Sequence, residues 1–274
     1  MNFHQKLQKN FQSKSTLLCV GLDPELEKLP SFLEKKPESI IIFCKEIIDS
    51  TAEFCIGFKP NIAFFERFGS IGLKQWELVI EHIKKNYPDH IIVADAKRGD
   101  LANTSKEYAH YFFKSLEVDS LTVSPYMGKD SLIPYLETGK QIFLLCLTSN
   151  PSSSDFQRII SSSDSKTLYE LVATLSLNLH SEFKDQVGLV VGATHPKELG
   201  SLRKEFPELP FLIPGYGAQG GNLQETLINS GTNSLINSSR SILYASSEKD
   251  FAIQARSQAK TISEEMKAIL QKLS

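Results

Sequence analysis

The sequence has no apolar run long enough to cross a membrane, no excess of charge of one sign and no paired cysteine motif. Its apolar stretches are much shorter than the roughly 20 residues that a transmembrane helix needs. The polar segment 1–15 also lacks the apolar core of a secretory signal. We therefore expect a protein that stays in the cytoplasm and does not associate with membranes.

The charge is nearly balanced, with 30 Lys and Arg against 32 Asp and Glu and a formal net charge of -2. Proteins that bind nucleic acid usually carry a basic surface that neutralises phosphates, so we expect no nucleic-acid partner. The balance is compatible with a local site for a small anion.

The four cysteines, Cys19, Cys44, Cys55 and Cys146, form no C-x-x-C pair, and three of them lie in apolar runs that resemble strands. Buried, reduced thiols are the expected state, which fits a reducing cytosol. Zinc binding is the weaker alternative, because no His or Cys stands at ligand spacing near them. We expect no metal and no other cofactor.

The 274 residues contain eight short apolar, β-branched runs that alternate with helical patterns. Some runs are apolar at consecutive positions, as in the segment 91–94, which is typical of parallel strands covered by helices. The expected strands are Thr16–Asp23, Cys55–Asn61, Ile91–Lys97, Ser120–Tyr126, Gln141–Ser149, Val187–Ala193, Pro210–Gly217 and Thr232–Arg240.

The segments between these runs have helical periodicity. In one of them Leu168, Leu171, Leu175 and Leu179 share a face, and the tail from Phe251 to Leu270 repeats apolar residues at helical spacing. Eight alternating units in this length predict a closed (β/α)8 TIM barrel, formed by a single domain of residues 1–274. An open doubly wound sheet is disfavoured, because no G-x-G-x-x-G follows the first strand.

The segment Ser149–Ser165 is rich in Ser, Asp and Pro. Because it follows the fifth expected strand, we interpret it as a mobile loop at the carboxyl end of that strand. The alternative is a disordered spacer without function.

Polar residues follow the expected strands at their carboxyl ends, where TIM barrels carry their active sites. Asp95 and Lys97 are two residues apart, so both point to the same side of their strand. Burying opposite charges inside a barrel is costly unless they are paired. Asp100 follows on the next turn, and Lys59 on the neighbouring strand can complete an alternating Lys–Asp–Lys–Asp array. Each residue taken alone, like Asp23 after the first strand, could be a solvated loop residue.

A glycine-rich segment, 215–221, follows the seventh expected strand and precedes a helical pattern. Glycines let backbone N–H groups approach an anion closely, and a helix N-terminus favours negative charge. Arg240, at the end of the eighth strand, offers a bidentate donor for phosphate. We favour a phosphate site over the alternative of a tight turn and a surface arginine.

The hexapeptide Asp95-Ala96-Lys97-Arg98-Gly99-Asp100 matches the D-x-K-x-x-D signature of orotidine 5′-monophosphate decarboxylases. Further motifs of that family occur in order from the first strand to the eighth, over nearly the whole chain. The chain therefore resembles this family, and within it the bacterial subgroup with longer chains. The further motifs are Gly21-Leu22-Asp23-Pro24, Phe58-Lys59-Pro60-Asn61, the segment from Pro214 to Gly221, and Ser239-Arg240-Ser241-Ile242.

The resemblance implies decarboxylation of orotidine 5′-monophosphate to uridine 5′-monophosphate, the last step of de novo pyrimidine nucleotide biosynthesis, without a cofactor. Lys59, Asp95, Lys97 and Asp100 would form the catalytic tetrad. Asp95 would lie against the substrate carboxylate, and Lys97 would protonate C6 of the pyrimidine.

The resemblance also implies a set of substrate-binding residues and a homodimer with shared active sites, because Asp100 and Thr104 reach into the partner's site in this family. Asp23, Lys59 and Thr104 would hold the ribose hydroxyls, and Ser149 would contact the pyrimidine. The 5′-phosphate would be bound by Gln219, Gly220, Gly221 and Arg240.

Two rival functions stay open. A sugar-phosphate decarboxylase of the same superfamily shares D-x-K-x-x-D but uses Mg²⁺, which Asp23, Glu66 and Asp95 could bind through oxygen ligands. A cation at that place would face the ammonium groups of Lys59 and Lys97, which argues against it. The other rival is a barrel that binds a nucleotide phosphate without catalysis.

Overall fold

The structure, a computed structural model, describes residues 1–216 and 221–273. Its eight strands are hydrogen-bonded in sequence order as a closed barrel, which confirms the predicted (β/α)8 fold. Most observed strands are shorter than the predicted runs, because the polar residues at their carboxyl ends belong to loops. The strands are β1 (Leu18–Leu22), β2 (Gly57–Pro60), β3 (Ile91–Arg98), β4 (Ser120–Val123), β5 (Gln141–Leu147), β6 (Val187–Val191), β7 (Phe211–Ile213) and β8 (Ser234–Ser238).

The chain forms two compact units, residues 1–96 with 237–274 and residues 97–236. The division falls within β3 and within β8: the second unit is one continuous run of the sequence, and the first combines the segments on either side of it. The single domain expected from the chain length stays a prediction.

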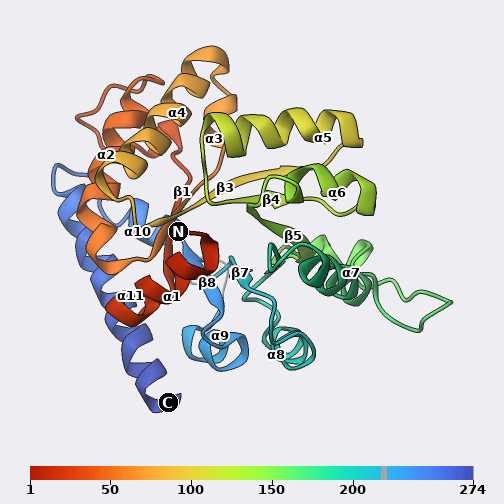
Figure 1. The fold of residues 1–274 in the computed structure, drawn as a ribbon. Coiled ribbons are helices and arrows are strands. Elements are labelled where there is room, and N and C mark those ends of the chain that lie inside the picture. Colours follow the sequence, from red (N-terminus) through yellow and green to blue (C-terminus); the bar gives the residue numbers. More distant parts are fainter. Residues whose placement is uncertain (217–220, 274) are drawn as a thin grey trace. The chain divides into compact units, whose positions relative to one another are not determined.

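The first unit surrounds its strands with helices whose apolar faces are buried. The helix α2 packs against both α4 and α11 (Figure 1). The predicted apolar series of the tail is buried along α11, from Phe251 to Leu270, which confirms its periodicity. The helices are α1 (Phe3–Lys14), η1 (Leu26–Lys28), α2 (Ser39–Thr51), η2 (Ala52–Phe54), α3 (Ala63–Glu66), α4 (Gly69–Asn86), α10 (Arg240–Leu243) and α11 (Phe251–Leu273).

In the second unit α5 packs on α6, α8 packs on α9, and α7 covers β5 and β6 (Figure 1). The predicted loop after β5 contains a short 3-10 helix and an isolated bridge between Ile160 and Thr167, so it is not an unstructured spacer. The helices are α5 (Ala102–Ala109), the π-helix η3 (His110–Ser115), α6 (Lys129–Leu136), η4 (Pro151–Asp155), α7 (Leu168–Glu182), α8 (Pro196–Glu205) and α9 (Leu223–Ser230).

The helix α7 turns a different face inward from the one that its leucines suggest. Of the four leucines in the predicted stripe only Leu179 is buried, and Leu168 is exposed. The small side chains of Ala173 and Ser176 face inward instead, because they let the helix approach β5 and β6 closely. The buried residues of α7 are Tyr169, Ala173, Ser176, Leu179 and His180.

All four cysteines are buried and none forms a disulfide, as the sequence predicts. Burial raises the pKa of each thiol, that of Cys55 to about 12. In the part of the chain that the structure describes, no helix is both long and apolar enough to span a bilayer.

Candidate active site

A buried ion pair occupies the carboxyl ends of β2 and β3 in the first unit. The Nζ atom of Lys59 lies 2.7 Å from Oδ2 of Asp95 and 4.0 Å from Oδ1 of Asp23. Lys59 is 4% exposed and Asp95 is 6% exposed, whereas Asp23 is half-buried. The structure thus brings together three of the residues that the sequence singled out.

The Lys59 ammonium is held in its charged state. Burial opposes that charge, but the carboxylates of Asp95 and Asp23 outweigh the loss of hydration and raise the pKa of Lys59 above its ordinary value. A buried pair of this kind contributes little net stability, since both partners lose their hydration. Its retention inside the barrel therefore points to a chemical role.

Near this pair, Asn237 was missed in the sequence, and Ser239 was noted there only as part of a motif, without a role. Asn237, on β8, is 6% exposed and donates from Nδ2 to Oγ of Ser239 over 3.1 Å. The carboxamide oxygen of Asn237 and Oδ1 of Asp23 are buried without a hydrogen-bond partner. Unsatisfied buried oxygens are costly, so these two atoms are candidates to accept hydrogen bonds from a ligand.

Gly21 lets these side chains approach β1. A Cβ at this position would collide with the Ser239 hydroxyl and lie 3.0 Å from Oδ1 of Asn237. The Gly21-Leu22-Asp23-Pro24 motif thus has a packing reason at its first residue. The sequence signal that could have found Asn237 is its spacing of two from Ser239 within the predicted strand Thr232–Arg240, which would place both on one side.

Lys97 has a backbone conformation that is unusual for a side chain of its size. Its φ is 46°, in the left-handed region, and its N–H donates to Oγ1 of Thr122 over 3.0 Å within the second unit. This conformation costs roughly 1–2 kcal/mol for a residue other than glycine. Such strain is found preferentially at functional sites, and here it accompanies an exposed ammonium group.

Asp100 and Thr104 lie at the start of α5. The Asp100 carboxylate accepts the N–H of Leu101 over 2.7 Å, and its carbonyl accepts the hydroxyl of Ser105 over 2.9 Å. Thr104 is exposed on the helix. The Lys59–Asp95 pair belongs to the first unit, and Lys97 and Asp100 to the second, so the complete tetrad stays a prediction.

Two of the predicted phosphate ligands, Gln219 and Gly220, lie outside the described residues. The N–H of Gly221 donates to the carbonyl of Gly215 over 3.3 Å, and a Cβ at 221 would lie 2.7 Å from the Cβ of Ala193. The helix α9 begins two residues later, which confirms that a helix follows the glycine-rich segment. In the first unit Arg240 is the exposed first residue of α10.

Within residues 1–216 and 221–273, no group of three or more His, Cys, Asp or Glu side chains is arranged to hold a metal ion. The alternative set of Asp23, Glu66 and Asp95 therefore does not form a ready-made metal site there.

The family model described as Orotidine 5′-phosphate decarboxylase / HUMPS family matches residues 16–255. The chain belongs to this family. A relative named orotidine 5′-phosphate decarboxylase in Leptospira interrogans is 54% identical over 263 residues, which are 96% of this chain and 94% of the relative. One of the same name in Bacteroides fragilis is 44% identical over 274 residues, 97% of this chain and 99% of the relative.

Solved structures of the family have the same fold. The structure of Leishmania donovani OMP decarboxylase is similar with a TM-score of 0.85 and 37% identity, over 98% of this chain and 99% of that one. That of Leishmania donovani UMP synthase has a TM-score of 0.86 and 39% identity, and the chain spans 56% of its length.

Proposed function

We propose that this protein catalyses the decarboxylation of orotidine 5′-monophosphate to uridine 5′-monophosphate, the last step of de novo pyrimidine nucleotide biosynthesis. The observation that carries the proposal is the buried Lys59–Asp95 pair at the carboxyl end of β3, followed two residues later by the strained, exposed Lys97. Membership of the family and the near full-length match to relatives named as this decarboxylase support it.

The proposed reaction uses only side chains of the tetrad. The bond between C6 and the carboxyl carbon breaks, carbon dioxide leaves, and the electron pair stays on C6. The Lys97 ammonium stabilises that charge and then transfers a proton to C6, after which solvent reprotonates the amine. Asp95 lies against the departing carboxylate, and Lys59 and Asp100 keep the alternation of charge.

The remaining motifs of the resemblance provide the binding site. Asp23, Lys59 and Thr104 hold the ribose hydroxyls, and Ser149 contacts the pyrimidine. Binding energy from the phosphate, which is remote from C6, can be used to assemble the site around the reacting carbon. The phosphate ligands in this proposal are Gln219, Gly220, Gly221 and Arg240.

The proposed active unit is a homodimer in which Asp100 and Thr104 reach into the partner's site. The exposure of Thr104 and of the neighbouring Leu101, which is 63% exposed, supports an interface at the start of α5. The proposed location is the cytoplasm, which fits four buried thiols without a disulfide.

The test is a spectrophotometric assay of the purified protein with orotidine 5′-monophosphate, with and without EDTA. Turnover that survives EDTA is the expected result. Turnover that EDTA abolishes, or turnover only of a sugar phosphate with Mg²⁺, would assign the chain to the metal-dependent branch instead. Binding of uridine 5′-monophosphate without any turnover would indicate a barrel that binds the nucleotide phosphate without catalysis.

A further inference from the structure

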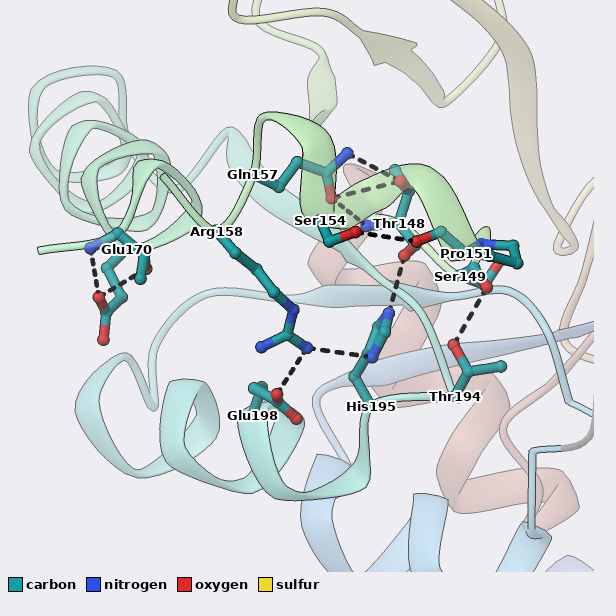
Figure 2. A network of polar contacts seen from close by, with 11 residues as sticks. Thr148, Ser149, Pro151, Ser154, Gln157, Arg158, Glu170, Thr194, His195 and Glu198 are labelled. Atoms are coloured by element: carbon teal, nitrogen blue, oxygen red, sulfur yellow. Dashed lines mark hydrogen bonds and ion pairs between the residues drawn. The ribbon is translucent and has the colours of Figure 1, made fainter. Parts of the chain in front are cut away.

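The backbone of Thr148, immediately before Ser149, is held by a glutamine from the returning loop. The Thr148 N–H donates to Oε1 of Gln157 over 2.8 Å, and Nε2 of Gln157 donates to Oγ1 of Thr148 over 2.8 Å (Figure 2). One side chain thus makes two complementary hydrogen bonds with one residue. The turn from β5 into the loop is closed by this contact.

Two residues between β6 and α8 hold the other polar groups of the same backbone. The Nε2 atom of His195 lies 3.0 Å from the Thr148 carbonyl, and Oγ1 of Thr194 donates to the Ser149 carbonyl over 3.2 Å (Figure 2). Because a carbonyl only accepts, the His195 ring carries its proton on Nε2. The carbonyl of each peptide group that flanks Ser149 is therefore bound by a side chain from the segment between β6 and α8. We call Gln157, Thr194 and His195 the Ser149 clamp.

The ring of His195 is oriented in turn by an ion pair. The guanidinium of Arg158 donates to Oε1 of Glu198 over 2.6 Å, and the same nitrogen lies 3.4 Å from Nδ1 of His195 (Figure 2). With the proton on Nε2, Nδ1 of His195 is unprotonated and can accept a hydrogen bond from the Arg158 guanidinium. This arrangement fixes the tautomer that lets His195 donate to the loop.

Backbone packing leaves little space for Ser149 to move toward β6. The N–H of Gly192 donates to the Leu147 carbonyl over 2.7 Å, and a Cβ at Gly192 would lie 2.7 Å from the Cα of Ser149. Any side chain at 192 would displace Ser149. The position of Ser149 is thus set by hydrogen bonds and by close approach of the neighbouring strand.

We propose that Gln157, Thr194 and His195 are positioning residues that hold Ser149 in place for its contact with the pyrimidine. The proposal rests on the proposed function, in which Ser149 makes that contact. A side chain held in its bound position before the ligand arrives loses little conformational freedom on binding. The clamp therefore strengthens recognition of the base and does not contribute to recognition of the phosphate.

The experiment compares two ligands on variants of His195. In His195→Leu the dissociation constant of uridine 5′-monophosphate and the KM of orotidine 5′-monophosphate should each rise about tenfold, as expected for one lost, partly buried hydrogen bond. The dissociation constant of inorganic phosphate, measured by calorimetry, should change by less than about twofold. His195→Gln, which keeps an N–H donor, should recover most of the affinity for the nucleotide.

Lys197→Ala is the matched control, because this exposed neighbour on α8 takes no part in the clamp. If His195→Leu does not fold, Thr194→Val removes one hydrogen bond to Ser149 at nearly constant side-chain shape. It should weaken the binding of uridine 5′-monophosphate without weakening the binding of phosphate. Equal weakening of both ligands, or no change in a folded variant, would overturn the proposal. Absence of turnover in the wild type would refute the proposed function alone, because the dissociation constants of uridine 5′-monophosphate and of phosphate still test the clamp. A wild type that binds phosphate but not uridine 5′-monophosphate would refute both the proposed function and the clamp.

Discussion

The first unit has a lysine at each end of the strand β2, Lys59 buried and Lys14 partly buried, and the two lysines differ in their electrostatic surroundings. At the carboxyl end, burial opposes the charge of Lys59, but the carboxylates of Asp95, at 2.7 Å, and Asp23 together outweigh it, so the pKa of Lys59 is raised. At the amino end, desolvation is the largest effect on Lys14, and its pKa is lowered. The surroundings thus stabilise the charged form of Lys59 at the carboxyl end of β2 and disfavour the charged form of Lys14 at the amino end.

The partners of Lys14 explain this difference. Its Nζ donates to the carbonyls of Ala52 and Cys55 over 2.7 Å each and lies 3.0 Å from Nε2 of His90. These groups satisfy hydrogen bonds and join α1 to the start of β2 and β3. In TIM barrels the amino ends of the strands serve stability and the carboxyl ends carry the chemistry, and the two lysines follow that division.

The largest expected effect is on catalysis and concerns a further lysine, the exposed Lys97 at the carboxyl end of β3. Lys97→Ala removes both the proposed proton donor and the charge that stabilises the carbanion, so kcat should fall about 10⁴-fold or more. The dissociation constant of uridine 5′-monophosphate, measured by calorimetry, should change much less. Lys204→Ala, at an exposed position of α8, is the control. Normal turnover in Lys97→Ala would contradict the role.

The next effect concerns stability. Lys59→Met removes the ammonium that lies 2.7 Å from the buried Asp95 carboxylate and should lower the free energy of unfolding by about 3–5 kcal/mol. Lys14→Met leaves only neutral acceptors unpaired and should cost about 1–3 kcal/mol. Urea denaturation of both variants measures the difference directly. Equal losses would mean that Lys59 and Lys14 contribute equally to stability despite their different surroundings.

The carboxyl-end lysine and its partner could be predicted from the sequence, whereas the amino-end cluster could not. Lys59 and Asp95 interrupt apolar strands at the end where barrels carry active sites, and a period of two places Asp95 and Lys97 on one side. Lys14 and His90 meet across 76 residues. No local pattern indicates such a contact, because it depends on where α1 ends relative to the sheet.

The sequence pattern also could not predict which face of a helix is buried or which residues a loop contacts. The leucines of α7 define a stripe, but the helix packs through Ala173 and Ser176, because the space above the sheet selects small residues. Gln157 falls in a stretch of low complexity, and nothing in its sequence neighbourhood indicates a bond to Thr148. Both features follow from tertiary packing.

His90 provides a third test through pH. Burial, with the nearby Lys14 charge, lowers the pKa of His90 to about 4, below the ordinary value of about 6.5. The unfolded chain therefore takes up the proton first, and stability is lost as pH falls from about 6.5 through about 4, by about 3 kcal/mol in total. In His90→Gln the loss of unfolding free energy over this range should be smaller by that amount. The exposed His110, changed to Gln, is the control and should keep the wild-type profile.

The smallest expected effect concerns a cation that is not buried, Arg240 at the carboxyl end of β8. If Arg240 binds the 5′-phosphate, Arg240→Ala should raise the dissociation constant of uridine 5′-monophosphate about 10- to 100-fold, since a charge-assisted hydrogen bond contributes about 1.5–3 kcal/mol. Uridine, which has no phosphate, should bind equally well to wild type and variant. Arg256→Ala removes a guanidinium from the surface pair with Glu53 and should change neither ligand. If Arg240→Ala weakens the binding of uridine 5′-monophosphate and of uridine equally, this arginine is a structural residue of α10. The buried Lys59 and the exposed Arg240 could then no longer be assigned to catalysis and to phosphate binding, respectively.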